Sequence, residues 1–476
     1  MRARAPASHA SWLLPLLLAG CAGPHVETAQ LAPLTPPAQW RVDPGATAPL
    51  ERAWWQAFGD PVLTELVTHA LANNLDIAIA GTRVRDAKAQ EMAARAALLP
   101  TLDAVASGAD SRSLNAFGQP TEQTAAQPQV QAAWEIDLFG RLSDTRSAAR
   151  SAWLASEAAR DSVRLSIASA VASGYINLLA LDARLQTAQQ TLTARAQTLR
   201  LIQRREAAGY SPKLERMQAE AEYQAAAQII PPLEQAIAQQ ENGLKLLTGE
   251  LPGAIARGGT LATLTEPAIP DGLPSELLRR RPDVTQAEWQ LAAADSSLSA
   301  ARKRFLPQLR LNGSAGAVVS TLLGDPISIW SIGGSILAPL FEGGRLRAGA
   351  ESTGAQRDSA AFAYRKTALN AFREVNDALV AAQQADRQLA ILVKQRDALA
   401  ESYRLATNRY KEGYSPYLEQ LDAQRGLLSA ELALIQARAN AMQARVTLYQ
   451  VMGGGWSADM IAQAHQAAAI PQGVTP

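Results

Sequence analysis

The sequence repeats itself over a long distance, and this repeat limits the possible folds more than any other feature. Residues 204–215, Arg-Arg-Glu-Ala-Ala-Gly-Tyr-Ser-Pro-Lys-Leu-Glu, recur as residues 408–419, Asn-Arg-Tyr-Lys-Glu-Gly-Tyr-Ser-Pro-Tyr-Leu-Glu. The same shift aligns Arg141 with Arg345 and Asp182 with Asp386. Earlier in the chain a slightly larger shift aligns residues 99–102 with residues 306–309. The chain is therefore predicted to contain two copies of one unit, residues 61–249 and 268–453.

Each unit is predicted to begin with a helix and to continue with two strands. The helices are expected at residues 62–98 and 274–305, because each pattern ends at a proline, Pro100 or Pro307. Apolar and polar residues then alternate with a period of two, which is typical of a strand with one wet face and one apolar face. Strands are expected at residues 101–111, 128–138, 308–320 and 327–339. The polar segments 112–125 and 321–326 between them are expected to form hairpin loops.

Long helical hairpins are predicted to follow the strands, at residues 142–247 and 346–452. The first arm of the first hairpin lacks proline over about 65 residues, which at 1.5 Å per residue makes a rod of about 100 Å. Leucines at a spacing of seven (Leu178, Leu185, Leu192 and Leu199) favour coiled-coil packing. Gly209 and Gly413 are expected to end these first arms, and a returning helix follows each of them.

The returning helices are expected to differ between the two copies. Pro231 and Pro232 interrupt the first one and must kink or break it. The matching position in the second copy, near Ile435, has no proline.

The N-terminus has the pattern of a bacterial lipoprotein signal. Residues 1–20 begin with basic side chains and continue with a short apolar run, and Leu18-Ala19-Gly20-Cys21 resembles a lipobox. We expect residues 1–20 to be a signal peptide, Cys21 to carry lipid, and residues 21–60 to be a lipidated linker. An ordinary signal peptide with an incidental cysteine is the alternative. Because Cys21 is the only cysteine, a disulfide framework and a thiolate metal site are excluded.

Composition argues against several classes of function. The chain has 45 basic and 44 acidic residues, which are interspersed, so a basic face for nucleic acid is not supported. The four histidines have no metal-binding or triad-like spacing, and we therefore expect no enzyme activity, no cofactor and no metal. After the signal, no segment has 18 consecutive apolar residues, which argues against a membrane-spanning helix.

The predicted strands require assembly with other chains. Strand edges cannot face lipid unpaired, and the smallest membrane barrels have about eight strands. Four strands in one chain cannot close such a barrel, whereas a dimer supplies eight and a trimer twelve. A closed ring of strands that is continued by a ring of long helices forms a duct.

At this level of detail the sequence resembles the TolC-type outer-membrane efflux proteins, in particular their NodT-like lipoprotein branch. The resemblance covers nearly the whole mature chain. The residues that carry it are Trp54-Trp55 through Phe58, Trp134 to Arg141, Leu273 to Val284, Pro339 to Arg345, Ala371 to Val375 and Gly453 to Trp456.

The resemblance implies an α+β, mostly α fold in a homotrimer. Each chain would give four strands to a twelve-stranded barrel in the outer membrane and long helices to a coiled-coil tunnel in the periplasm. The linker 250–267 would belong to an equatorial domain, and residues 454–476 would form a C-terminal tail. The implied function is that of a passive duct, which a periplasmic adaptor protein connects to an inner-membrane pump of the resistance–nodulation–division type.

The resemblance also points to two functional places. The hairpin tips match those that meet the adaptor; they are Gly209, Tyr210, Ser211, Pro212, Gly413, Tyr414, Ser415 and Pro416. Just inside the tips, the family closes its periplasmic mouth with a tyrosine and carboxylates, and the residues at those positions are Tyr410, Asp422, Glu419 and Glu215. A solvated helix face is the alternative for each of these charges. A ring of carboxylates at the mouth would attract cations and disfavour anions.

Two other functions remain open from the sequence. The duct could serve type I protein secretion or metal export in place of drug efflux, because the pump rather than the duct selects most cargo. A periplasmic scaffold lipoprotein without a barrel is the second, and the four alternating segments argue against it.

Overall fold

The computed structural model describes residue 28 and residues 34–43, 47–114 and 116–457. The predicted signal peptide, Cys21 and most of the predicted tail therefore lie outside the described residues. Two compact units are present. The first contains described residues of 83–156 and 286–365, and the second contains those of 34–82, 157–285 and 366–457. Helices α3 (Leu75–Ala96), α4 (Arg141–Ala207), α8 (Pro282–Lys303) and α9 (Arg345–Lys411) contribute residues to both.

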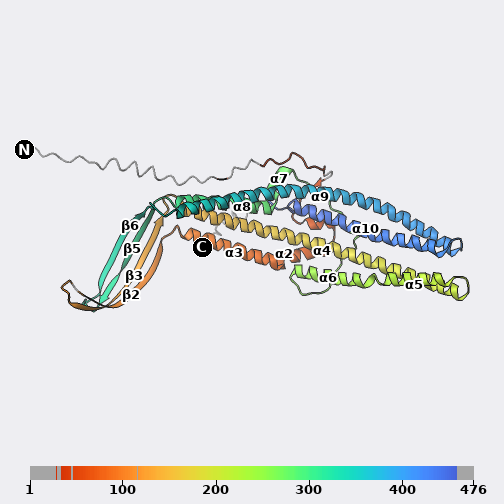
Figure 1. The fold of residues 1–476 in the computed structure, drawn as a ribbon, viewed down its shortest axis with the longest axis horizontal. Coiled ribbons are helices and arrows are strands. Elements are labelled where there is room, and N and C mark those ends of the chain that lie inside the picture. The colour runs from red at the N-terminus through yellow and green to blue at the C-terminus, as the bar shows by residue number, and fades with distance from the viewer. Residues whose placement is uncertain (1–27, 29–33, 44–46, 115, 458–476) are drawn as a thin grey trace, which may run out of the picture. The chain divides into compact units, whose positions relative to one another are not determined.

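A four-stranded antiparallel sheet dominates the first unit (Figure 1). Its strands are β2 (Thr101–Leu114), β3 (Pro120–Ile136), β5 (Gln308–Ser320) and β6 (Ile327–Leu337), in the order β2-β3-β5-β6. Repeat one supplies the first pair of strands and repeat two the second pair. Strands β2 and β6 are the two edges of this sheet.

The register gives this sheet one polar and one apolar face. Asp103, Gln131, Ser314 and Ser331 lie opposite one another in a row that crosses all four strands. One residue along, the row consists of Leu102, Ala132, Gly313 and Ile332. Because side chains alternate between the faces of a strand, the period-two pattern of the sequence becomes two chemically different surfaces.

The predicted loop at residues 112–125 is wrong in its extent. Strand β2 continues to Leu114 and β3 already begins at Pro120, so the connection is much shorter. Residues 120–127 contain polar, small and proline residues, which hid the strand pattern. The β3–β5 ladder has a gap opposite Pro128, where the proline lacks an N–H to donate. The strands predicted to end at residues 138 and 339 end at Ile136 and Leu337.

The predicted first helix of each repeat is also wrong, because both are broken. Residues 62–98 form α2 (Pro61–Asn73) and α3, which Asn74 separates with an extended backbone. The Asn74 side chain accepts hydrogen bonds from the N–H groups of Asp76 and Ile77 and so caps α3. Residues 274–305 form α7 (Pro274–Arg280) and α8, which Arg281 separates. Arg281 precedes Pro282, and a residue before proline disfavours helix.

The two helical hairpins differ as their prolines require. Helix α4 returns through α5 (Lys213–Ala227) and α6 (Ile230–Thr248), and Pro231 and Pro232 lie in the first turn of α6. Helix α9 returns through the single helix α10 (Tyr417–Val451). A proline is tolerated in the first turn of a helix but not in its interior, so the break in the first hairpin starts a new helix there.

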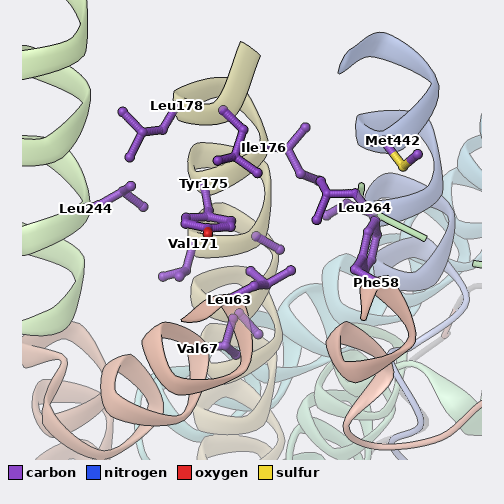
Figure 2. Packing of buried hydrophobic residues seen from close by; sticks show 14 of the residues in the cluster. Phe58, Leu63, Val67, Val171, Tyr175, Ile176, Leu178, Leu244, Leu264 and Met442 are labelled. Carbon is purple, nitrogen blue, oxygen red and sulfur yellow. The ribbon is translucent and has the colours of Figure 1, made fainter. Parts of the chain in front are cut away.

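A hydrophobic core holds the hairpins to the start of repeat one (Figure 2). Tyr175 of α4 is fully buried in it, and its hydroxyl donates to the Asp60 carboxylate at 3.1 Å and accepts from Gly258 N–H at 2.9 Å. Burial, above all, raises the pKa of Tyr175 to about 12. Asp60 in turn caps helix α2. Trp54 and Phe58, in the 3-10 helix η3 (Trp54–Phe58), are buried in the same core.

One described helix, α4, contains an 18-residue stretch that is long and apolar enough to cross a membrane. This stretch has a mean hydropathy of 1.4, and 61% of it is buried inside the protein. It overlaps the core residues around Tyr175, and packing in that core accounts for its composition.

Candidate functional site

The two hairpin tips turn through the same backbone structure. Gly209 and Gly413 have φ angles of 80° and 78°, in the left-handed region that favours glycine. Tyr210 N–H donates to Arg205 O at 2.8 Å, and Tyr414 N–H donates to Arg409 O at 2.8 Å. With the shorter-range bonds of the two glycine N–H groups, this is the Schellman ending of a helix. Pro212 and Pro416 then occupy the N-cap positions of the returning helices, without a side-chain capping bond.

Each tip presents an aromatic and an aliphatic side chain to solvent. Tyr210 is 85% exposed and Tyr414 is 80% exposed. Leu214 and Leu418, in the first turn of each returning helix, are also exposed. Exposed apolar side chains that cluster on a short turn are typical of a surface that binds another protein.

Tyr410 lies in a small buried cluster that joins the two hairpins of one chain. It is only 4% exposed, and its ring lies 5.6 Å from the ring of Tyr417, between centroids. The guanidinium carbon of Arg205, on the first hairpin, lies 5.1 Å from the Tyr410 ring centroid. The other members of the cluster are Leu199, Ile202, Ala219 and Leu421. Tyr410 therefore acts in the structure as an anchor between the hairpins.

Burial and nearby carboxylates raise the pKa of both phenols. Burial is the main factor that raises the pKa of Tyr410, and the Glu215 carboxylate adds to this rise while Arg205 opposes it. Burial, followed by the Glu222 charge, raises the pKa of Tyr417 to about 12. Each phenol can donate a hydrogen bond but carries no charge at neutral pH.

A buried ion-pair cluster that the sequence reasoning missed lies next to these tyrosines. Glu222 of α5 is 7% exposed, and its carboxylate pairs with Arg195 of α4 at 2.9 Å. Arg425 of α10 reaches the same carboxylate from the second hairpin, with Nε donating at 2.9 Å. The Glu222 carboxylate thus ties three helices together.

The repeat itself contains the signal that could have found this cluster. The positions of Arg195 and Glu222 in the first copy are occupied by Leu399 and Gly426 in the second. Two charges that replace an apolar residue and a glycine at matched inward positions indicate an ionic contact specific to one copy.

The structure separates the four predicted gate residues into two groups. Tyr410 and Glu215 come together near the tips, since the charge of Glu215 affects the pKa of Tyr410. Glu419 pairs with Arg409 at 3.3 Å on the second hairpin itself. Asp422 has a side chain that is 66% exposed and lies 3.9 Å from Arg425. Glu419 and Asp422 therefore face outward from the single chain, where a second chain could reach them.

Metal binding has no support in the described part of the chain. Among the described residues, no group of three or more His, Cys, Asp and Glu side chains could hold a metal ion.

Comparison with known proteins gives a consistent result over nearly the whole chain. Residues 66–250 and 273–454 each match the outer membrane efflux protein family, and these two segments overlap the two repeats. The sequence is 34% identical to the pyoverdine export outer membrane protein OpmQ of Pseudomonas putida, over 94% of this chain and 97% of that protein. It is 35% identical to the solvent efflux pump outer membrane protein SrpC of Pseudomonas putida, over 84% of this chain and 87% of that protein. The fold is similar to that of the outer-membrane channel OprN, with a TM-score of 0.80 and 27% identity over 92% of this chain and 99% of that one.

Proposed function

The chain belongs to the outer membrane efflux protein family, and on this premise we propose that it forms a passive homotrimeric duct. The duct would carry small molecules from an inner-membrane pump and a periplasmic adaptor across the periplasm and the outer membrane. It would have no catalytic activity, and the pump, of the resistance–nodulation–division type, would supply the energy.

The two-faced sheet is the observation that carries this proposal. Its apolar face suits lipid and its polar face suits water, while β2 and β6 leave their outer edges unpaired within the chain. Unpaired edges are unstable in a bilayer, so β6 of one chain is expected to pair with β2 of the next. Three chains then supply twelve strands, an even number that is common in such barrels.

The hairpin tips are proposed as the docking surface for the adaptor. Tyr210 with Leu214, and Tyr414 with Leu418, give each chain two exposed apolar contacts, and three chains give six. Ser211 and Ser415 are partly buried in their turns. They would therefore stabilise the conformation of the tip and contribute little to contacts with the adaptor.

Tyr410, Glu215, Glu419 and Asp422 are proposed to close the periplasmic mouth, with two different roles. Tyr410, beside Glu215, would hold the two hairpins of one chain together. Glu419 and Asp422 are exposed on the single chain and would therefore act between neighbouring chains or on cations that pass.

Lipidation of Cys21 is proposed as a second attachment to the outer membrane, with palmitate among the acyl chains. The barrel is itself an anchor, so we expect the Cys21→Ser protein to lose its lipid and still reach the membrane.

The cargo is proposed to be small organic molecules. Similar proteins are described as exporting pyoverdine or as parts of solvent, toluene and antibiotic efflux pumps. Protein secretion and metal export are weaker alternatives, and a scaffold without a barrel leaves the two faces of the sheet unexplained.

Disulfide trapping in outer-membrane fractions tests the trimer. Ser107→Cys in β2 is combined in turn with a cysteine at position 329, 331, 333 or 335 of β6, in a Cys21→Ser background. At the correct register we expect oxidation to give covalent dimers and trimers. The pair Val130→Cys and Ala315→Cys, which face each other within one chain, is the matched control and should link only internally. Cross-links within single chains for every β2–β6 pair would contradict the proposal.

A further inference from the structure

An open pocket of about 380 Å³ in the first unit is lined by four arginines, at the end of the sheet where the strands meet the helices. These are Arg141, Arg304, Arg310 and Arg345. Glu342 is the one carboxylate among the described lining residues, and Glu135 lies just behind Arg141 and Arg310. Four guanidinium groups therefore face two carboxylates.

Two of the four arginines are already neutralised. Arg141 pairs with Glu135 at 2.5 Å, and both side chains are about four-fifths buried. Arg345 pairs with Glu342 at 2.7 Å. These two pairs use both nearby carboxylates and leave the pocket with a positive excess.

The other two arginines carry that excess. Arg310 lies 3.7 Å from Glu135, which is already held by Arg141, and its own side chain is 53% exposed. Arg304 is exposed, and no described carboxylate forms an ion pair with it. Both guanidinium groups retain free N–H donors and enough freedom to close around an oxyanion.

Comparison between the repeats argues that this excess is not needed for folding. With the larger shift that aligns the strand starts, Arg304 corresponds to Ala97 and Arg310 corresponds to Asp103. The first copy makes the same change from helix to strand without these positive charges. The change from helix to strand that the two copies share therefore does not require these arginines.

The face on which the pocket opens indicates what can reach it. Arg310 lies opposite Glu135, on the face that also carries Gln131 and Ser314. The apolar side chains Trp134 and Leu311 point to the other face. A solute in water can reach the polar face, whereas lipid headgroups would gather on the apolar side.

We infer that Arg304 and Arg310 form a binding site for the carboxylate or phosphate groups of anionic solutes inside the duct. This inference rests on the proposed function, because that function makes the polar face the inner wall. Three chains would place six such arginines around the lumen, where they would concentrate anions at the periplasmic end of the strands.

Titration calorimetry of the full-length protein in detergent, with tripolyphosphate at low salt, tests the site directly. We expect binding, and about tenfold weaker binding for the double variant Arg304→Gln and Arg310→Gln, which loses two charge-assisted contacts. Arg112→Gln is the matched control, because Arg112 is an exposed arginine at the other end of the same sheet. Equal affinity in all three proteins would overturn the inference.

Two further measurements distinguish a binding site in the lumen from one for lipid headgroups, and test the binding site independently of the duct. Phosphatidylglycerol in nanodiscs should leave tripolyphosphate affinity unchanged relative to phosphatidylcholine; competition would mean a headgroup site and overturn the inference. In planar bilayers the double variant should lose chloride permeability relative to potassium, and the control should not. If the wild-type protein conducts but does not bind tripolyphosphate, the anion-binding site is refuted and the duct stands. If it binds tripolyphosphate but does not conduct, the duct is refuted, and with it the position of the arginine site inside a lumen.

Discussion

Asp182 and Asp386 occupy the same position in the two repeats, and each accepts hydrogen bonds from an arginine of different origin. Arg257, from the linker between the repeats, pairs with Asp182 at 2.8 Å and also with Glu241. Arg445, from α10, pairs with Asp386 at 2.7 Å and with Glu266 of the linker. Arg445 occupies the repeat position of Glu241, so an arginine of the hairpin in the second copy replaces a glutamate in the first. The linker 250–267 supplies the opposite charge in each case, Arg257 or Glu266, and is thereby bound to both hairpins.

These two clusters should differ in their contribution to stability. The side chain of Arg445 is 8% exposed and that of Arg257 is 26% exposed. Arg445→Ala removes a buried guanidinium with its packing and leaves the partly exposed Glu266 and Asp386 carboxylates close together without a cation, and we expect it to cost about 3 kcal/mol of unfolding free energy. Arg257→Ala should cost about 1–2 kcal/mol, because the Arg257 side chain is more exposed and its loss removes less packing. Thermal unfolding in detergent measures both, and a larger loss for Arg257→Ala would contradict this ranking.

Contacts between the hairpins should control how far the periplasmic mouth opens. Tyr410→Ala removes a large side chain from the buried cluster that joins the hairpins. Arg425→Gln removes the only cation of the second hairpin that pairs with Glu222 among the described residues. We expect each variant to raise single-channel conductance about twofold and to sensitise cells to large antibiotics such as vancomycin.

Arg404→Gln is the control for these gate variants, because Arg404 lies on α9, as Tyr410 does, and pairs with Glu401 at the surface. It should leave conductance and antibiotic sensitivity unchanged. Normal trimers of the Tyr410→Ala and Arg425→Gln proteins that conduct like the wild type would show that these contacts do not hold the mouth closed.

One glycine of the sheet should be needed for its register. A Cβ atom at Gly316 would lie 2.3 Å from the carbonyl oxygen of Pro128 on the neighbouring strand. Gly316→Ala should therefore separate β3 from β5 and lower the temperature up to which the proposed trimer survives on gels. Gly333→Ala is the control, because a Cβ there would meet no described atom within 4 Å. Equal heat resistance of the two variants would argue against a tight strand contact at Gly316.

Acidic pH should stabilise the protein through Glu431. Burial raises the pKa of Glu431 above its usual 4.5, although Arg396 opposes this effect. Since the folded state holds this proton more tightly than the unfolded state, the contribution is complete below pH 4.5 and is lost as the pH rises through the raised pKa. Glu431→Gln should remove this slope from the dependence of the unfolding midpoint on pH.

Glu401 provides a control of opposite sign for this pH dependence. A hydrogen bond from Arg404 lowers the pKa of Glu401. Its contribution to stability is therefore present above pH 4.5 and is lost as the pH falls through the lowered pKa. Slopes of the same sign for Glu431→Gln and Glu401→Gln would contradict these assignments.

The parts of the fold that depend on local pattern could be predicted from the sequence. The internal repeat gave the two hairpins, because Gly-Tyr-Ser-Pro occurs at each tip and glycine is the residue that ends a helix in the left-handed region. Alternation gave four strands, and β5 begins and ends where the pattern does. The breaks at Asn74 and Arg281 were missed, although they lie at equivalent positions and Arg281 precedes a proline.

The contacts of the candidate gate depend on tertiary structure and could not be predicted from the spacing of residues along the sequence. Tyr410 was identified through its distance from the tip glycine, but its burial against Tyr417 and Arg205 depends on how the hairpins pack. Glu222 was missed because a single glutamate in an amphipathic helix resembles any solvated residue. Its two arginine partners lie 27 and 203 residues away along the chain.

Single-channel recording of the purified trimer in a planar lipid bilayer tests the duct most directly. We expect stepwise currents in the wild-type protein, larger steps for Tyr410→Ala, and entry of the protein into the bilayer even when Cys21→Ser has removed the lipid anchor. A properly assembled trimer that never conducts, or a Cys21→Ser protein that behaves as a soluble monomer, would contradict the proposed duct.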